Sequence, residues 1–120
     1  MRAILINPED QTVTEIDIEK GLPAIYAQIG NNCSTFECPF TYPNGDTIYC
    51  DEEGLYHENI GGFMYDGWAF PIVGRALVIG QNPDTGNSID AKSHINAIEF
   101  DLDFIAKDDK NLERYFYRHN

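Results

Sequence analysis

The chain has 120 residues and a formal net charge of −12, from 20 acidic and 8 basic side chains. A surface this acidic repels free nucleic acid and anionic membrane headgroups, so direct binding to either is disfavoured. With 42% hydrophobic and 12% aromatic residues the chain is not a disordered acidic tail, and its length predicts a single domain over residues 1–120.

The N-terminal stretch and the cysteines indicate a cytosolic protein. Residues 1–8 hold too short an apolar run for a signal peptide, and no run reaches the roughly 18 residues that a membrane span requires. Cys33, Cys38 and Cys50 make an odd count, which is a poor disulfide framework. We therefore expect reduced thiols and a cytosolic location.

The first 31 residues predict a β-hairpin followed by a short helix. Residues 2–7 form a nearly continuous apolar run and residues 12–18 alternate, which predicts two strands joined by a turn at 8–11. Apolar residues at i, i+3, i+4 and i+7 then predict one helical face, with Gly30 as the C-terminal cap. The residues with this spacing are Leu22, Ile25, Tyr26 and Ile29.

The segment 42–46 holds the clearest turn signal. Its sequence, Tyr-Pro-Asn-Gly-Asp, predicts a type I turn closed by a glycine with positive φ, which gives a three-residue hairpin loop. A third strand at 55–57 is predicted to run back beside Tyr49 and Cys50, forming a meander. The pairs expected in the hairpin are Tyr42 with Asp46, Phe40 with Ile48, and Cys38 with Cys50.

The second half alternates between loops and buried segments. Residues 58–72 mix glycines and large apolar side chains without a period, which predicts a structured loop. Residues 74–80 predict a buried strand, and residues 98–104 alternate between apolar and acidic side chains, which predicts a strand with one acidic face. A terminal helix is expected over about 108–118.

Together these elements predict an α+β fold. We expect a mixed, mainly antiparallel sheet with one short helix packed on it and a C-terminal helix.

The sequence offers no specific catalytic or metal-binding signature. It has no P-loop, no GxGxxG, no HExxH and no GxSxG motif. Cys33, Cys38, Cys50 and His57 lack the paired spacing of a structural zinc site, so buried cysteines are favoured over metal ligands. We therefore expect no catalytic residue, no cofactor and no metal site; a small hydrolase using His57 and Glu58 is the weakest alternative.

An aromatic cluster in the 58–72 loop leaves two interpretations open. The side chains could form a lid over the core, or they could line a site for a small ligand. The second interpretation supports an alternative function, binding or sequestering a nucleotide signal, and is compatible with a homo-oligomer that completes the pocket. The residues of this ligand loop are Phe63, Tyr65, Trp68 and Phe70.

The acidic residues gather in two clusters. On the predicted strand at 98–104, carboxylates two residues apart would lie about 7 Å from each other, close to the phosphate spacing along a DNA strand. A solvated face, a partner protein with a basic groove, and calcium are the alternatives, and calcium lacks its usual ligand order. The two clusters are Asp51, Glu52, Glu53 and Glu58, and Glu99, Asp101 and Asp103.

Three stretches carry a resemblance to a known group. The opening residues 2–9 with a helix ending at Gly30, residues 51–55 and residues 71–80 resemble small uncharacterised proteins of bacteriophages, plasmids and related mobile elements, which tend to show an Asn-Glu-Glu-Gly turn and a late Val-Gly-x-x-x-Val-x-Gly strand. That group is known only as a domain of unknown function. The resemblance covers about residues 1–80, and Asp51 stands where the group tends to have Asn. It implies a mobile-element origin and a host-cytoplasmic location, and it implies no catalytic residue.

These observations lead to one principal hypothesis. The protein is expected to be a non-enzymatic acidic binding protein that inhibits a host defence complex by nucleic-acid mimicry. It would present the two acidic clusters to a host protein with a basic surface, without binding nucleic acid or membrane itself.

Overall fold

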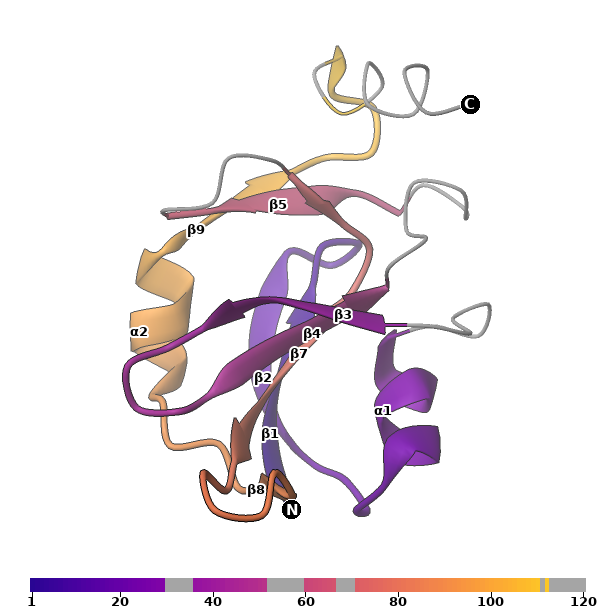
Figure 1. Cartoon of the computed structure of the whole chain (residues 1–120). Helices are drawn as coiled ribbons and strands as arrows, with labels where there is room; N and C mark the ends of the chain where they lie inside the picture. The colour runs from indigo at the N-terminus through magenta and orange to yellow at the C-terminus, as the bar shows by residue number, and fades with distance from the viewer. Residues whose placement is uncertain (30–35, 52–59, 67–70, 111, 113–120) are drawn as a thin grey trace.

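The computed structural model describes residues 1–29, 36–51, 60–66, 71–110 and 112, and for residues 36–40 only the backbone. It confirms the predicted α+β class, because antiparallel strands form two sheets that pack with two short helices (Figure 1). In chain order the elements are β1 (Arg2–Asn7), β2 (Thr12–Asp17), α1 (Leu22–Ile29), β3 (Phe36–Thr41), β4 (Thr47–Asp51), β5 (Gly62–Tyr65), β6 (Ile72–Val73), β7 (Ala76–Gln81), β8 (Ser88–Ile89), α2 (Ile95–Phe100) and β9 (Leu102–Ile105).

The larger sheet consists of two hairpins joined through a strand from later in the chain. β1 and β2 pair from Arg2 opposite Asp17 to Asn7 opposite Thr12, so the predicted N-terminal hairpin is confirmed. β7 lies between β1 and β4, which gives the order β2-β1-β7-β4-β3, and β8 pairs with β7. β7 is therefore the central strand, and its residues Ala76 to Gly80 are all buried, as predicted.

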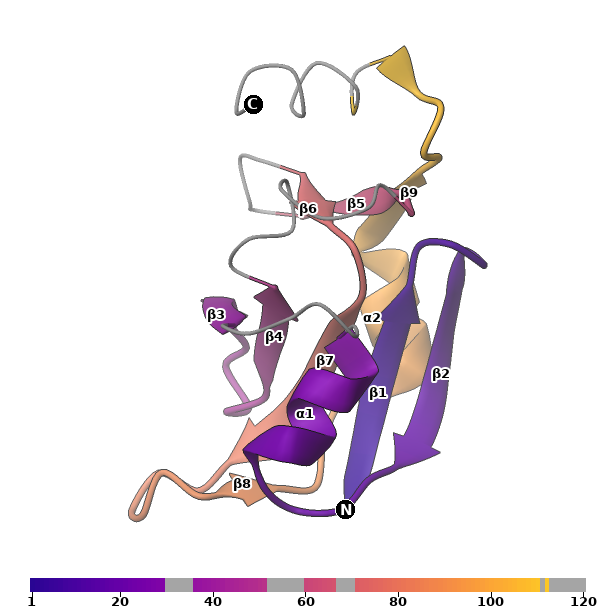
Figure 2. The ribbon, with the colours of Figure 1, turned by 90° about the vertical axis from the view of Figure 1, so that its right-hand side faces the viewer.

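Alternate residues of the central strands form two hydrophobic cores, one on each face of this sheet. Ala3 and Leu77 pack with Ile25 of α1, which confirms the predicted helix and its packing on the sheet. Of the predicted apolar face, Ile25 and Ile29 are buried, whereas Leu22 is exposed, and the predicted cap Gly30 lies outside the described residues. Ile4 and Val78 belong to the opposite core, which α2 and the smaller sheet close. The two helices therefore cover opposite faces of the larger sheet, and β5, β6 and β9 stack at one end (Figures 1 and 2).

The smaller sheet, β6-β5-β9, corrects the prediction of a strandless loop at 58–72. Phe63 and Tyr65 are buried and Met64 between them is half-buried, so the segment does alternate like a strand. Gly62 is required by close packing, because a Cβ atom there would lie 2.5 Å from the carbonyl oxygen of Ile72. Gly62, one of the glycines that obscured the period, therefore lets β5 and β6 approach each other.

The turn at 42–46 forms as predicted. Gly45 has φ +93°, its N–H donates to the Tyr42 carbonyl oxygen, and the Tyr42 N–H donates to the Asp46 carbonyl oxygen at 2.7 Å. Phe40 lies opposite Ile48, also as predicted. The predicted pairing of Cys38 with Cys50 is wrong, because the register shifts between residues 37 and 40 and places Glu37 opposite Cys50.

The predicted third meander strand and the predicted terminal helix fall wholly or mostly outside the described residues. The predicted third meander strand, residues 55–57, lies outside the described residues, but the position beside Tyr49 and Cys50 belongs to β7. Most of the predicted terminal helix also lies outside them. Within it, Leu112 is buried and its N–H donates to the carbonyl oxygen of Asp109.

The predicted strand at 98–104 is wrong, because this segment divides into α2 and β9. The His94 side chain caps α2 by accepting a hydrogen bond from the Asn96 N–H, and the helix ends at Asp101. Ile95, Ile98 and Leu102 also lie at helical spacing, so the same residues fit both periods. The cap and the packing of Ile98 into the core favour the helix.

A short irregular segment, residues 90–93, is held between a buried carboxylate and a guanidinium. Asp46 is fully buried, and its two carboxylate oxygens accept the Lys92 N–H at 3.0 Å each, while Oδ2 also accepts the Ser93 N–H at 2.7 Å. From the other side, the Arg2 guanidinium donates to the carbonyl oxygens of Ala91 at 2.6 Å and Ser93 at 3.0 Å. This clamp fixes the chain that leads into α2.

Replacing Asp46 by Asn tests the clamp. Asp46→Asn puts an amide N–H₂ among backbone N–H donors, so we expect the free energy of unfolding to fall by about 2–4 kcal/mol. Asp84→Asn, at an exposed turn residue, is the control and is expected to change it by less than about 0.5 kcal/mol. Urea denaturation followed by circular dichroism measures both, and equal effects would contradict the role of Asp46.

Candidate protein-interaction site

The second predicted acidic cluster lies at the junction of α2 and β9 instead of along one strand. Glu99 is on the last turn of α2, Asp101 follows the helix, and Asp103 is in β9. Glu99 and Asp103 are exposed, whereas Asp101 is half-buried. The regular two-residue spacing expected for these carboxylates is therefore lost, although all three remain within one short stretch of the surface.

Phe100 lies in the middle of this stretch, and its exposure differs from the sequence prediction. Its side chain is 89% exposed, although the strand prediction placed it in the core. Helical spacing explains the exposure, because Ile98 faces the core and a residue two positions later points away from it. A helical interpretation of 95–102 would have found this exposed aromatic side chain from the sequence.

Asp101 has a structural partner in the smaller sheet. The Tyr65 hydroxyl hydrogen-bonds the Asp101 carboxylate and also contacts the Tyr42 hydroxyl. The Tyr42 and Tyr65 rings meet edge to face, with centroids 5.7 Å apart. The Asp101 carbonyl oxygen accepts the Asp66 N–H at 2.9 Å. Asp101 therefore joins the end of α2 to β5, and Glu99 and Asp103 are the more accessible carboxylates.

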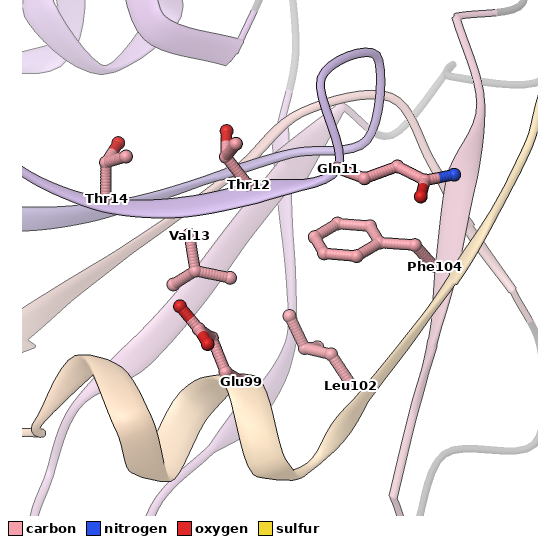
Figure 3. Close-up of a pocket in the computed structure, with 7 residues that line it drawn as sticks. All are labelled: Gln11, Thr12, Val13, Thr14, Glu99, Leu102 and Phe104. Atoms are coloured by element: carbon pink, nitrogen blue, oxygen red, sulfur yellow. The ribbon is translucent and has the colours of Figure 1, made fainter.

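A pocket of about 390 Å³ opens beside the cluster, between β2 and the α2–β9 junction (Figure 3). The Glu99 side chain points from α2 toward Val13, whereas Thr12 and Thr14 point to the other side of β2. Leu102 and Phe104 supply apolar surface. The lining residues are Gln11, Thr12, Val13, Thr14, Glu99, Leu102 and Phe104.

The other predicted site residues separate into two groups. Phe63 and Tyr65 are 0% and 3% exposed and belong to the core. Asp51 is half-buried at the end of β4. The remaining predicted residues, Glu52, Glu53, Glu58, Trp68 and Phe70, lie outside the described residues.

The described residues give no geometric support for metal chemistry. In the parts of the chain that the structure describes, no three His, Cys, Asp or Glu side chains gather in a way that could hold a metal ion. Cys50 is buried, and a buried thiol in apolar surroundings is unreactive. Neither helix within the described ranges has the length and apolar character needed to cross a membrane.

These features define the chain as a two-sheet α+β protein with an acidic, aromatic surface patch and an adjoining pocket. It belongs to the family described as Domain of unknown function (DUF3846), whose model matches residues 1–102. The matched segment includes β1 through α2 and ends at the first residue of β9. No curated protein and no solved structure shows a significant match to the chain.

The contact between Tyr65 and Asp101 predicts a specific pH dependence. Burial, followed by the charge and hydrogen bond of Asp101, raises the pKa of Tyr65 above its ordinary value of 10.0. The folded protein therefore keeps the phenol proton at pH values where the unfolded chain loses it. We expect the stability contributed by Tyr65 to be complete below pH 10.0 and to decline above it, by up to about 1.4 kcal/mol per pH unit.

Tyr65→Phe separates this contribution from other titrations at high pH. The variant has no phenol at this position, so its free energy of unfolding should fall less steeply above pH 10 than that of the unmodified protein. Urea denaturation of both proteins at a series of pH values from about 8 to 11 measures the difference in slope. Parallel curves would show that Tyr65 does not retain its proton in the folded state.

Proposed function

We propose that the protein is a non-enzymatic binding protein that docks a partner with a basic surface through the α2–β9 patch, which comprises Glu99, Phe100, Asp101 and Asp103. The observation that carries this proposal is the 89% exposure of Phe100 between acidic neighbours. Buried aromatic anchors surrounded by polar residues dominate the energetics of many protein interfaces. Phe100 supplies the apolar anchor, and Glu99 and Asp103 supply the charged rim.

The charge of the whole chain supports the same kind of partner. A net charge of −12 attracts a basic protein over a distance, raises the association rate and makes that rate depend on salt. The same charge opposes direct binding to nucleic acid. A basic protein is thus the partner class that both the patch and the total charge favour.

The partner we favour is a host complex with a basic nucleic-acid groove, with the protein acting in the cytoplasm of a bacterial host as an inhibitor encoded by a mobile element. The resemblance of residues 1–80 to small proteins of bacteriophages and plasmids motivates the proposal of a mobile-element origin and a bacterial host. Carboxylates on α2 and β9 would compete with phosphates by charge. The mimicry does not rest on a strand with phosphate-like spacing, because Glu99 and Asp103 lie on different elements.

Substitution of the aromatic anchor tests the proposal. Phe100→Ala is expected to weaken capture of a basic partner from a bacterial lysate by about thirtyfold, since a central aromatic hot spot contributes about 2 kcal/mol. Leu22→Ala is the matched control, because Leu22 is the other large hydrophobic side chain that is exposed among the described residues, at 53%, and it lies on α1. Equal recovery of the partner by both variants would refute the role of the patch.

Charge reversal tests the electrostatic part. The double variant Glu99→Lys/Asp103→Lys should weaken the same complex by at least about tenfold at 50 mM salt, and by much less at about 500 mM salt. Asp84→Lys/Asp108→Lys changes the total charge equally at exposed residues outside the patch and serves as the control. A titration of binding against salt for the three proteins gives the comparison, and coincident curves would show that only the total charge matters.

A further inference from the structure

The outer edge of β2 presents backbone groups that no described strand pairs. β2 is the terminal strand of the larger sheet and pairs with β1 alone among the described strands. The Ile18 N–H donates to the Met1 carbonyl oxygen at 2.9 Å, so Met1 and Ile18 form a hydrogen-bonded pair. In an antiparallel ladder, hydrogen-bonded pairs alternate with pairs that exchange no hydrogen bonds. Counting back along β2 from Ile18, every second residue therefore directs its N–H and C=O groups away from β1, and these residues are Asp17, Glu15 and Val13.

The pocket beside α2 lies on this same edge. It is lined by three consecutive residues, Thr12, Val13 and Thr14, whose side chains alternate between the two faces of the sheet (Figure 3). Only the strand edge is common to all three, so the pocket extends along the edge of β2 and under Val13 toward α2. An added strand would therefore meet the outward backbone groups of Val13, which no described strand pairs, and the pocket at one place.

We propose that β2 accepts an extended segment of the basic partner as an additional antiparallel or parallel strand, and that a lysine or arginine side chain of this segment enters the pocket at Glu99. The inference rests on the proposed function, because it names how that partner binds at the same surface. Main-chain hydrogen bonds to the edge would give affinity, and the pocket would give specificity for alternate side chains.

The pocket chemistry selects a long cationic side chain. Val13, Leu102 and Phe104 offer apolar surface to the methylene stem of lysine or arginine, and the Glu99 carboxylate meets its charged end. Gln11 also lines the pocket. An acidic side chain would face the Glu99 carboxylate, and a purely apolar one would leave that carboxylate desolvated without a partner.

A second copy of the chain is the less favourable occupant. Pairing two β2 edges would bring together Glu15 and Asp17 of both copies. Arg2 and the N-terminal ammonium pair with these carboxylates within each chain, but each copy still carries a net charge of −12. Like charges that face each other across strands are destabilising. A basic segment has the opposite charge and meets no such repulsion.

Nuclear magnetic resonance with defined peptides tests this assignment. The probes are three pools of capped heptapeptides with Thr, Val or Ile at the flanking positions and a fixed central Lys, Glu or Leu. The lysine pool is expected to shift the amide resonances of Val13, Glu15 and Asp17 in the isotope-labelled full chain, more than those of Thr14 and Ile16. The glutamate pool should leave them unchanged, and the leucine pool should bind more weakly than the lysine pool.

Two variants separate the backbone contact from the side-chain contact. Glu15→Pro removes one outward N–H and leaves the β1 ladder intact, while Glu15→Ala removes the same carboxylate and keeps the N–H. Glu15→Pro should bind the lysine pool about fivefold more weakly than Glu15→Ala. Glu99→Gln should reduce the preference for the lysine pool over the leucine pool by about threefold. Thermal unfolding of each variant confirms that the fold is retained.

The outcomes distinguish this inference from the proposed function. Equal shifts with all three pools, equal binding by Glu15→Pro and Glu15→Ala, or β2 shifts that follow the concentration of the protein without peptide would each overturn strand addition. If strand addition is overturned but Phe100→Ala still weakens capture of the basic partner, the proposed function stands and only the β2 edge site is removed. Lysine-dependent β2 shifts together with unaltered capture by Phe100→Ala would support the edge site and remove the aromatic anchor.

Discussion

The fold depends on how residues 90–93 are held between Asp46 and Arg2. Burial of a carboxylate is costly, and at Asp46 the backbone N–H groups of Lys92 and Ser93 compensate for the lost water. Arg2 binds the carbonyl oxygens of the same segment. Because Asp46 belongs to the second hairpin and Arg2 to the first, one four-residue segment connects both hairpins to α2.

The surface patch follows from this connection. Once residues 90–93 are fixed, His94 begins α2, Ile98 packs into the core, and Phe100 is left outside. Tyr65 then holds Asp101 where the helix ends. The patch and the pocket are therefore built on a rigid base, which lowers the entropy that a partner must lose on binding.

Local chemistry made part of this structure predictable. Pro43, Asn44 and Gly45 predicted both the turn and the neighbouring register, and α1 follows its apolar spacing. The segment 98–104 fitted two periods equally, and only its tertiary packing selects the helix. The place of β7 and the bulge between residues 37 and 40 depend on contacts between distant segments, which no local pattern contains. The acidic residues of the site were predicted, whereas the exposure of Phe100 was missed because the strand period was chosen for 98–104, and the pocket was missed because it lies between distant segments.

The central position of β7 also constrains synthesis of the chain on the ribosome. The two hairpins on either side of it are complete by residue 51, yet they share no pairing with each other and can join only through residues 76–81. Until those residues emerge, β1 and β4 each expose an apolar edge that invites pairing with other chains. The interval in which the chain most needs protection by chaperones therefore ends when β7 inserts, and the strong negative charge of the early residues helps to keep nascent chains apart during it.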